Sequence, residues 1–276
     1  MSSFSALPNY PIEAPASWPM DAIERAALLD AAQEVRRCQQ ALAKAGLNVV
    51  GELLRGHEGF YEMNHYPDDD VYDRDSHAQY YYHAHREGAG EHGHFHTFLR
   101  GPGVPASLQQ TLAVPADVQS VTHLIAVSMD AWGQPIGLFA CNRWVTGESW
   151  FPAEAVEQML PRFAIDHAYP SWPTNLWLSA LLRLFRPHIL ALIAHRDQVI
   201  AAWQAQHPER DVFGDRALEI TGYLPISVDG WVALLAQAPA PRIAAGQESR
   251  QRQEPPGHDL IGLRKSGRTL STHAGS

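Results

Sequence analysis

Apolar residues near the start of the chain recur at intervals of three, four and seven, which is the periodicity of an amphipathic helix. The pattern from Ile23 to Leu42 predicts a helix over about residues 21–45. Asp21 precedes it as an N-cap. Arg25 is taken as the residue at the position where a capping box has glutamate or glutamine, so the sequence predicts an incomplete capping box. A short second helix is expected just beyond this one.

The middle of the chain alternates in polarity and is rich in aromatic residues, which predicts antiparallel strands. Residues 80–100, YYYHAHREGAGEHGHFHTFLR, have the form of a β-hairpin around a Gly-Ala-Gly turn. A second hairpin is expected from strands at Val121–Met129 and Pro135–Val145. The polar, acidic segment Gly56–Gln79 predicts a loop that is a candidate lid or ligand donor.

The second half of the chain has a helical pattern. One helix is expected over about 153–165, and another from Asn175 towards Gln206 with a break at Pro187. A last short helix runs from Ser227 or Asp229 to Leu235. These elements predict an α+β fold in which an antiparallel sheet of hairpins lies between an N-terminal helix and a C-terminal helical layer.

Composition sets the domain limits. The chain has 276 residues, enough for one α+β domain over residues 20–237. Residues 1–19 are rich in Pro, Ser and Ala and predict an irregular arm. Residues 238–276 are poor in apolar residues and locally basic, which predicts a disordered tail that could bind a protein partner.

Charge and targeting features narrow the function classes. The net charge of −9 gives no chain-wide basic field, so we expect no nucleic-acid partner. The sequence shows no secretory signal pattern and no run of 18 uncharged apolar residues, so we expect a cytoplasmic protein with no membrane partner. Cys38 and Cys141 are then expected to be reduced and to behave as small apolar residues.

Histidine is the unusual residue type, because the chain has 15 and eight of them fall between positions 57 and 96. In a strand, alternate residues share a face, so His83 and His85 form one set and His92, His94 and His96 form another. A tight loop of Gly88-Ala89 or of Ala89-Gly90 would bring four imidazoles onto one face, whereas a three-residue loop Gly88-Ala89-Gly90 would separate the two sets.

Imidazoles packed this densely would repel when protonated and would need partners when buried and neutral, and a bound metal ion satisfies both conditions. We therefore predict a metal-dependent enzyme, acting on a small molecule by oxidation or hydrolysis. Its cofactor would be a divalent transition metal, namely iron, copper or zinc, with iron or copper weakly favoured. Glu91 is the nearest carboxylate to serve as ligand or general base. Further shell candidates are His65, His123 and the acids of residues 68–75. The expected metal ligands are His83, His85, His92, His94 and His96.

Two other functions remain open. One is a non-enzymatic metal carrier or accessory protein, which would be favoured by exposed, flexible histidines. The other follows from the segment His92–Phe98, HGHFHTF, which resembles the motif of the histidine triad family. That resemblance implies nucleotide hydrolysis or transfer with His94 as the nucleophile. Gly93 and Thr97 stand where the motif usually has apolar residues.

Longer strings also carry a resemblance. YYYHAHRE, GEHGHFHTFLR and residues 142–148, followed by RFAIDHAYPSWP, are similar to an uncharacterised bacterial domain family over roughly residues 20–237. The resemblance implies one domain with the histidine hairpin inside it, and it attaches no activity to that domain.

Overall fold

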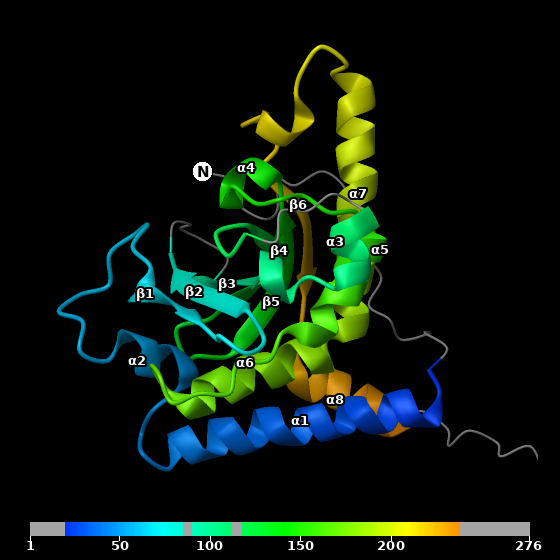
Figure 1. The fold of residues 1–276 in the computed structure, drawn as a ribbon. Helices are drawn as coiled ribbons and strands as arrows, with labels where there is room; N and C mark the ends of the chain where they lie inside the picture. The colour runs from blue at the N-terminus through cyan, green and yellow to red at the C-terminus, as the bar shows by residue number, and fades with distance from the viewer. Residues whose placement is uncertain (1–19, 85–89, 112–116, 238–276) are drawn as a thin grey trace, which may run out of the picture. The chain divides into compact units, whose positions relative to one another are not determined.

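The structure is a computed structural model that describes residues 20–84, 90–111 and 117–237 (Figure 1). Every described residue belongs to one compact unit, which ends at Ala240. The expected N-terminal arm and basic tail fall outside the described residues, so both stay predictions.

Helix α1 (Ala22–Ala43) begins and ends close to the predicted bounds. Its capping box is complete, contrary to expectation, because the helix starts at Ala22 and its third residue is Glu24. The Asp21 carboxylate accepts from the backbone N–H of Glu24, and the Glu24 carboxylate accepts from that of Asp21. A short helix follows, α2 (Val49–Leu54), as predicted.

Six strands form one antiparallel sheet in the order of the sequence. The predicted loop at 56–79 is wrong in its second half, which forms an edge strand. Tyr66 and Val71 are buried there, whereas Asp68 and Asp69 point to solvent, so acidic residues and a strand are compatible at this edge. The strands are β1 (Tyr66–Tyr72), β2 (Ala78–His83), β3 (Gly93–Arg100), β4 (Val121–Met129), β5 (Pro135–Cys141) and β6 (Ile220–Pro225).

The helical half follows the prediction with shifted ends. The expected strand to Val145 stops at Cys141 because the Asn142 side chain accepts from the next backbone N–H and begins a helix. The expected break at Pro187 is present as a 69° bend between two helices. The remaining helices are α3 (Ala106–Thr111), α4 (Arg143–Thr146), α5 (Ala153–Met159), α6 (Trp172–Leu184), α7 (Arg186–Gln206) and α8 (Val228–Gln237), with 3-10 turns at Gly101–Gly103, Leu160–Arg162 and Val212–Gly214.

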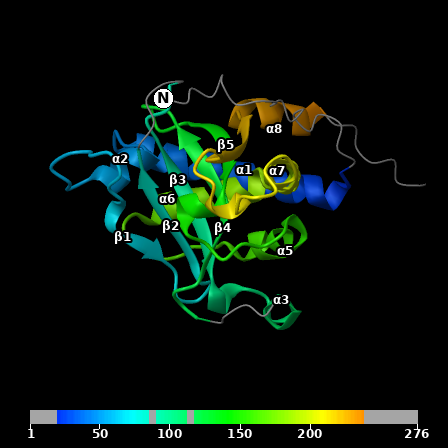
Figure 2. The same ribbon diagram turned by 90° about the horizontal axis from the view of Figure 1, so that it is seen from above.

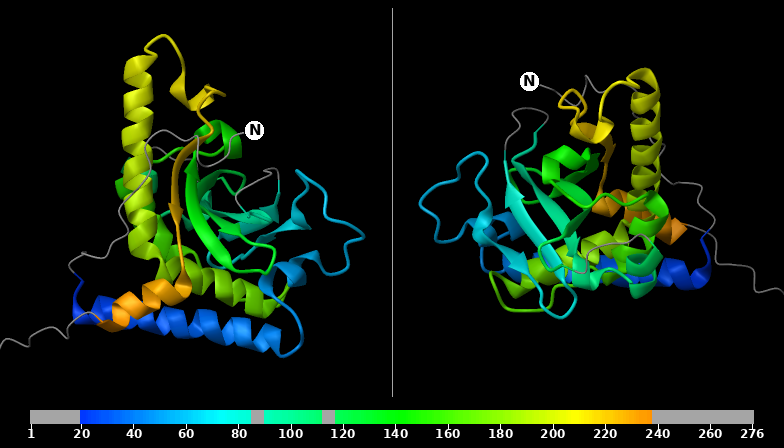
Figure 3. Two further views of the ribbon diagram at one scale, coloured as in Figure 1. Left: turned by 180° about the vertical axis from the view of Figure 1, so that it is seen from behind. Right: turned by 45° about the horizontal axis from the view of Figure 1, so that its top comes forward.

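Helices cover one face of the sheet, as Figures 2 and 3 show. On this helix-covered face Tyr80 donates a hydrogen bond to Asn175 of α6 (2.7 Å), and α7 packs Leu192 against Gly222 of β6. Helix α1 packs on α6 (Figure 1). The main apolar core lies between these helices and the sheet, and it leaves the other face of the strands for different chemistry.

No single helix in the described ranges has the length and hydropathy of a membrane span. Taken together α6 and α7 meet those two criteria, but they are separated by the 69° bend.

Candidate metal centre

The register of the first hairpin brings the histidines together. His83 on β2 lies directly opposite His94 on β3, which is the register expected for a Gly88-Ala89 loop. The loop residues 85–89 themselves, with His85, lie outside the described residues. Because alternate residues share a face, His83, His94 and His96 project from the sheet on the side away from the helices. We call this side the histidine face.

The three rings converge. Their centroids are 4.6 Å apart for His83 and His94, 5.0 Å for His94 and His96, and 5.2 Å for His83 and His96. Each pair is close to edge-to-face, and at most 6% of any of the three residues is exposed. One ring nitrogen from each lies within 4.8 Å of the others, so the three residues can hold a metal ion. We call His83, His94 and His96 the triad.

Glu91 orients one member of the triad. His94 Nδ1 donates to Glu91 Oε1 at 2.6 Å, and both side chains are buried. A proton on Nδ1 puts the lone pair of the neutral ring on Nε2, as a metal ligand requires, and such a carboxylate partner is usual behind a metal-binding histidine. The structure thus places Glu91 behind His94, where it would support a ligand; its predicted role as ligand or base stays a prediction.

A second group adjoins the triad. His96 Nδ1 and His123 Nε2 are 3.0 Å apart and share a hydrogen bond, and Cys141 Sγ lies 3.7 Å from His123 Nδ1. Ligand atoms of His96, His123 and Cys141 also lie within 4.8 Å of one another. His96 therefore belongs to both groups, and its Nδ1 faces His123.

A β-bulge brings His123 onto this face. Thr97 pairs with Ile125, but the next residue, Phe98, pairs with His123, so Leu124 is an extra residue in β4. Without that insertion, strict alternation from Ala126 would turn His123 towards the helices. Burial lowers the pKa of His123 to about 3, so its ring is neutral and can act as a ligand at ordinary pH.

A buried carboxylic acid supports the backbone of the second group. Glu148 accepts a hydrogen bond from the backbone N–H of His123 at 2.8 Å, and burial raises the pKa of Glu148 to about 7. Arg196 acts in the opposite direction on that pKa. Sequence reasoning missed Glu148, because nothing in its local pattern distinguishes it from a surface acid.

His92 does not join the triad. It precedes β3, and its ring stacks on Phe60 (centroids 4.8 Å apart) and shares a hydrogen bond with the Tyr82 hydroxyl (2.8 Å). Tyr82 belongs to the core on the helix-covered face. The expectation that His92 shares a face with His94 and His96 therefore fails, because strand alternation does not extend to a residue outside the strand.

His65 lies at the solvent side of the triad. Its ring stacks on Tyr81 and stands edge-on to His83, with centroids 5.6 Å apart. His65 Nδ1 bonds Asp70 Oδ1 at 2.9 Å, and 39% of the His65 side chain is exposed. The acidic segment thus contributes Asp70 as the partner of a histidine beside the triad. Asp68 lies elsewhere, with its Oδ1 3.6 Å from His57 Nδ1.

Other side chains complete the surroundings. The ring of Phe139 on β5 packs against two rings of the triad, with its centroid 5.0 Å from that of His94 and 5.8 Å from that of His96. Ser128 is opposite His94 on β4, and its buried hydroxyl makes no hydrogen bond within the part of the chain that the structure describes. A Cβ on Gly137, opposite Ser128, would collide with the Tyr223 hydroxyl, so glycine admits that hydroxyl to the histidine face.

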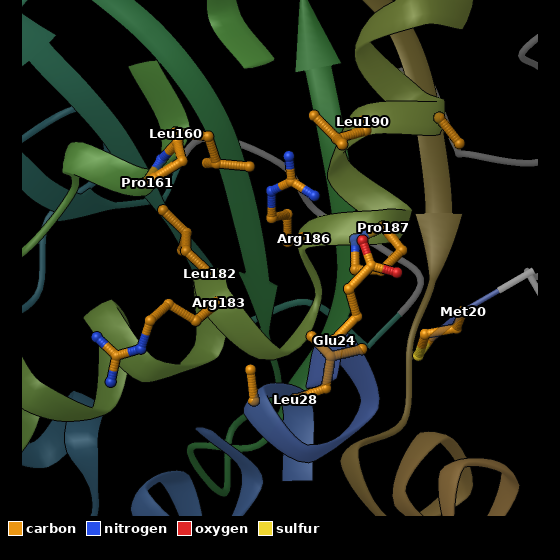
Figure 4. A pocket seen from close by; sticks show the side chains of 12 residues that line it. Met20, Glu24, Leu28, Leu160, Pro161, Leu182, Arg183, Arg186, Pro187 and Leu190 are labelled. Atoms are coloured by element: carbon orange, nitrogen blue, oxygen red, sulfur yellow. The ribbon is translucent and has the colours of Figure 1, made fainter. Parts of the chain in front are cut away.

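A pocket of about 580 Å³ lies elsewhere, among α1, α6 and α7 (Figure 4). Its lining is mostly apolar, and its arginines, Arg183 and Arg186, are paired with Glu34 and Glu157. None of the clustered histidines lines it, so it does not serve the candidate metal centre.

Cys141, Ser128 and Tyr223 were also missed from the sequence. Period-two spacing already puts residues 137, 139 and 141 on one face of a strand. Which face that is depends on the register of β4 and β5, and that register includes irregular steps. His123, in contrast, stood among the sequence candidates.

Comparison with known proteins gives a family and no activity. No curated protein and no solved structure matches the chain. The model of one family, described as a domain of unknown function, DUF6969, matches residues 29–226. That span contains both groups of candidate metal ligands and all six strands. The resemblance to an uncharacterised family is thereby confirmed, and the chain belongs to the DUF6969 family.

Proposed function

We propose that this protein is a metal-dependent enzyme whose ion is held by His83, His94 and His96, with Glu91 fixing the orientation of His94. The observation that carries the proposal is the convergence of three buried rings, one of them backed by a buried carboxylate. Structural zinc sites have four protein ligands, whereas three histidines leave a position for water or substrate.

The donor set favours zinc and hydrolysis over the iron or copper that the histidine content alone suggested. Non-haem iron oxygenases use two histidines and a carboxylate, and here the nearby carboxylate of Glu91 is occupied with His94 Nδ1. A zinc ion on three imidazoles supplies a hydroxide near neutral pH. The proposed substrate class is a small molecule with an electrophilic carbonyl.

Three groups of the chain would serve such a reaction. The Ser128 hydroxyl, opposite His94, would hydrogen-bond the attacking oxygen. The Tyr223 hydroxyl stays protonated, because burial and then Glu91 raise its pKa to about 12, so it would donate to developing negative charge. His65, bonded to Asp70 and half-exposed, would move protons between the triad and solvent.

Burial argues against the carrier function. A protein that loads and releases metal readily is expected to present exposed, flexible histidines. Here the triad lies on two paired strands and is almost wholly buried, with its rings packed on Tyr81 and Phe139. Such a site favours retention of the ion through many turnovers.

Local packing also argues against the nucleotide chemistry that the resemblance to the histidine triad family implies. His94 is 0% exposed, and a nucleophile must reach phosphorus. The two departures from that motif have reasons of their own here. A Cβ on Gly93 would lie 2.6 Å from the Tyr82 hydroxyl, and the Thr97 hydroxyl bonds the backbone of the bulge in β4.

The first test is the metal content of untagged protein, measured by elemental mass spectrometry. We expect His83→Ala to lose one ion per chain relative to the wild type and to lose zinc-dependent hydrolysis of an activated ester such as 4-nitrophenyl acetate. His92→Phe is the matched control, because it keeps the stack on Phe60 and removes a neighbouring imidazole outside the triad.

Circular dichroism of each variant establishes that it is folded. Equal metal content in folded His83→Ala and wild type would refute the triad as the site. Loss of metal in His92→Phe would do the same. Iron or copper in place of zinc would keep the site and redirect the chemistry towards oxidation.

The expected location of the protein and its expected partners also belong to this proposal. A cytoplasmic, reducing setting would keep Cys38 and Cys141 as thiols. The absence of nucleic-acid and membrane partners remains a prediction. A protein partner for residues 238–276 concerns a segment outside the described residues.

A further inference from the structure

The His96 ring stands between two sets of donors. His83 and His94 are its partners in the first group, and in the second its Nδ1 faces His123, whose own Nδ1 faces Cys141. The two ring nitrogens of an imidazole point in different directions, so each can serve its own ion. The donors of the second side come from β3, β4 and β5, at the site where the bulge turns His123.

We propose that His96, His123 and Cys141 form a second metal position. It shares His96 with the triad and takes a thiophilic ion such as zinc or Cu(I). The inference rests on the proposed function in one respect, namely that the triad holds the first ion. It makes the centre dinuclear, with imidazole ligands alone at the first position and a thiolate at the second.

The distances fit this position after small movements. Bonds of about 2.1 Å to nitrogen and 2.3 Å to sulfur place tetrahedral ligands roughly 3.4–3.6 Å apart. His96 Nδ1 and His123 Nε2 now lie 3.0 Å apart, and Cys141 Sγ lies 3.7 Å from His123 Nδ1. The ion would replace the hydrogen bond between the two imidazoles, and a rotation of His123 would direct one nitrogen at it.

The surroundings favour a soft ion. His123 and His96 are enclosed by aromatic rings. The ring centroids are 5.3 Å apart for Phe98 and His123 and 5.2 Å apart for Tyr81 and His96. His123 and Cys141 are 4% and 1% exposed, so water competes weakly for the ion. Thiolate is the protein ligand that selects Cu(I) and zinc over harder metals.

Proton balance sets the chemistry of loading. The Cys141 thiol loses its proton to solvent when its sulfur binds the ion. When both positions are filled, His96 also loses its remaining N–H proton and bridges the ions as an imidazolate. No oxidant or reductant takes part, and the second ion releases two protons per chain.

Cobalt(II) reconstitution of the untagged full chain tests the second position separately from the first. Cobalt on the triad gives visible ligand-field bands, and cobalt on a thiolate adds a near-ultraviolet charge-transfer band. We expect two ions per chain and both kinds of band in the wild type. Cys141→Ser should lose the thiolate band and one ion, while His83→Ala should keep the thiolate band.

A matched control is Cys38→Ser, because Cys38 is the other buried cysteine and lies on α1. It should leave the thiolate band unchanged. Should Cys141→Ser not fold, X-ray absorption of the wild type decides the question, with one sulfur neighbour at about 2.3 Å expected for one of the two ions.

The failures are distinguishable. Visible bands with one ion per chain and no thiolate band would overturn the second position and leave the proposed function standing. No cobalt binding at all would overturn both. A single ion with a thiolate band that survives His83→Ala would overturn the triad as the first position, and with it the two-ion centre.

Discussion

His188 is a buried histidine without a part in the metal centre, and it gives the fold a sensitivity to acid. It lies on α7 with its ring edge-on to Phe185 and Trp231, at centroid distances of 5.0 and 4.6 Å. Burial lowers its pKa to about 4 from an ordinary value of 6.5. Because the unfolded chain takes up this proton at a higher pH than the folded chain, stability falls as pH drops from about 6.5 towards 4.

We expect His188→Leu to reduce that loss. At pH 5 the shift amounts to about 2 kcal/mol of unfolding free energy, and above pH 7.5 it contributes almost nothing. Urea unfolding of wild type and variant at pH 7.5 and pH 5 gives the difference. His207→Leu, at the half-buried C-cap of the same helix, is the control. Equal acid sensitivity in wild type and His188→Leu would contradict the prediction.

At the scale of elements, the bulge in β4 determines which residues belong to the candidate metal centre. The Thr97 hydroxyl, on the helix-covered side of β3, donates to the Ile125 carbonyl at 2.6 Å and accepts from the Ile125 N–H at 3.3 Å. These bonds hold the strand at the step where Leu124 is extra and His123 turns over. Thr97 therefore positions His123, a candidate ligand.

Thr97→Val keeps the shape of this side chain and removes both bonds. We expect a loss of about 1–2 kcal/mol in the free energy of unfolding, because a buried carbonyl loses its partner. We also expect a weaker thiolate band in the cobalt protein, since His123 and Cys141 would lose their alignment. Thr97→Ser retains the hydroxyl and should retain most of the stability and the band. A valine variant as stable as the wild type would show that the bulge holds without this hydroxyl.

The same element shows what the sequence could and could not predict. Local periodicity was sufficient for α1, for the strand Val121–Met129 and for the break at Pro187. Three loops stayed open for the hairpin, and the structure has the pairing of His83 with His94 that one of them predicts. The bulge depends on a hydroxyl from a neighbouring strand, so a single segment carries no signal for it. Cys141 therefore looked like an ordinary apolar residue.

At the scale of the whole molecule, a bound metal ion would add a link between strands that backbone pairing, packing and side-chain hydrogen bonds such as Thr97 to Ile125 already hold together. The triad connects β2 to β3, and the second position would extend the connection to β4 and β5. Because a preformed triad does not exist in the unfolded chain, binding free energy adds to folding free energy. Zinc at 100 times its dissociation constant should stabilise the fold by about 2.7 kcal/mol per site.

For a domain of this size that gain raises the midpoint of thermal unfolding by roughly 5–10 °C. This shift applies to each occupied position, so with two positions filled we expect chelated wild type to unfold about 10–20 °C earlier than zinc-saturated wild type. His83→Ala should show a smaller difference, because only the second position remains. Calorimetry of the four samples at one pH and one protein concentration measures both differences. Identical midpoints with and without zinc would mean that no ion binds the folded state in preference to the unfolded chain, and the histidine face would then need another explanation for its buried imidazoles.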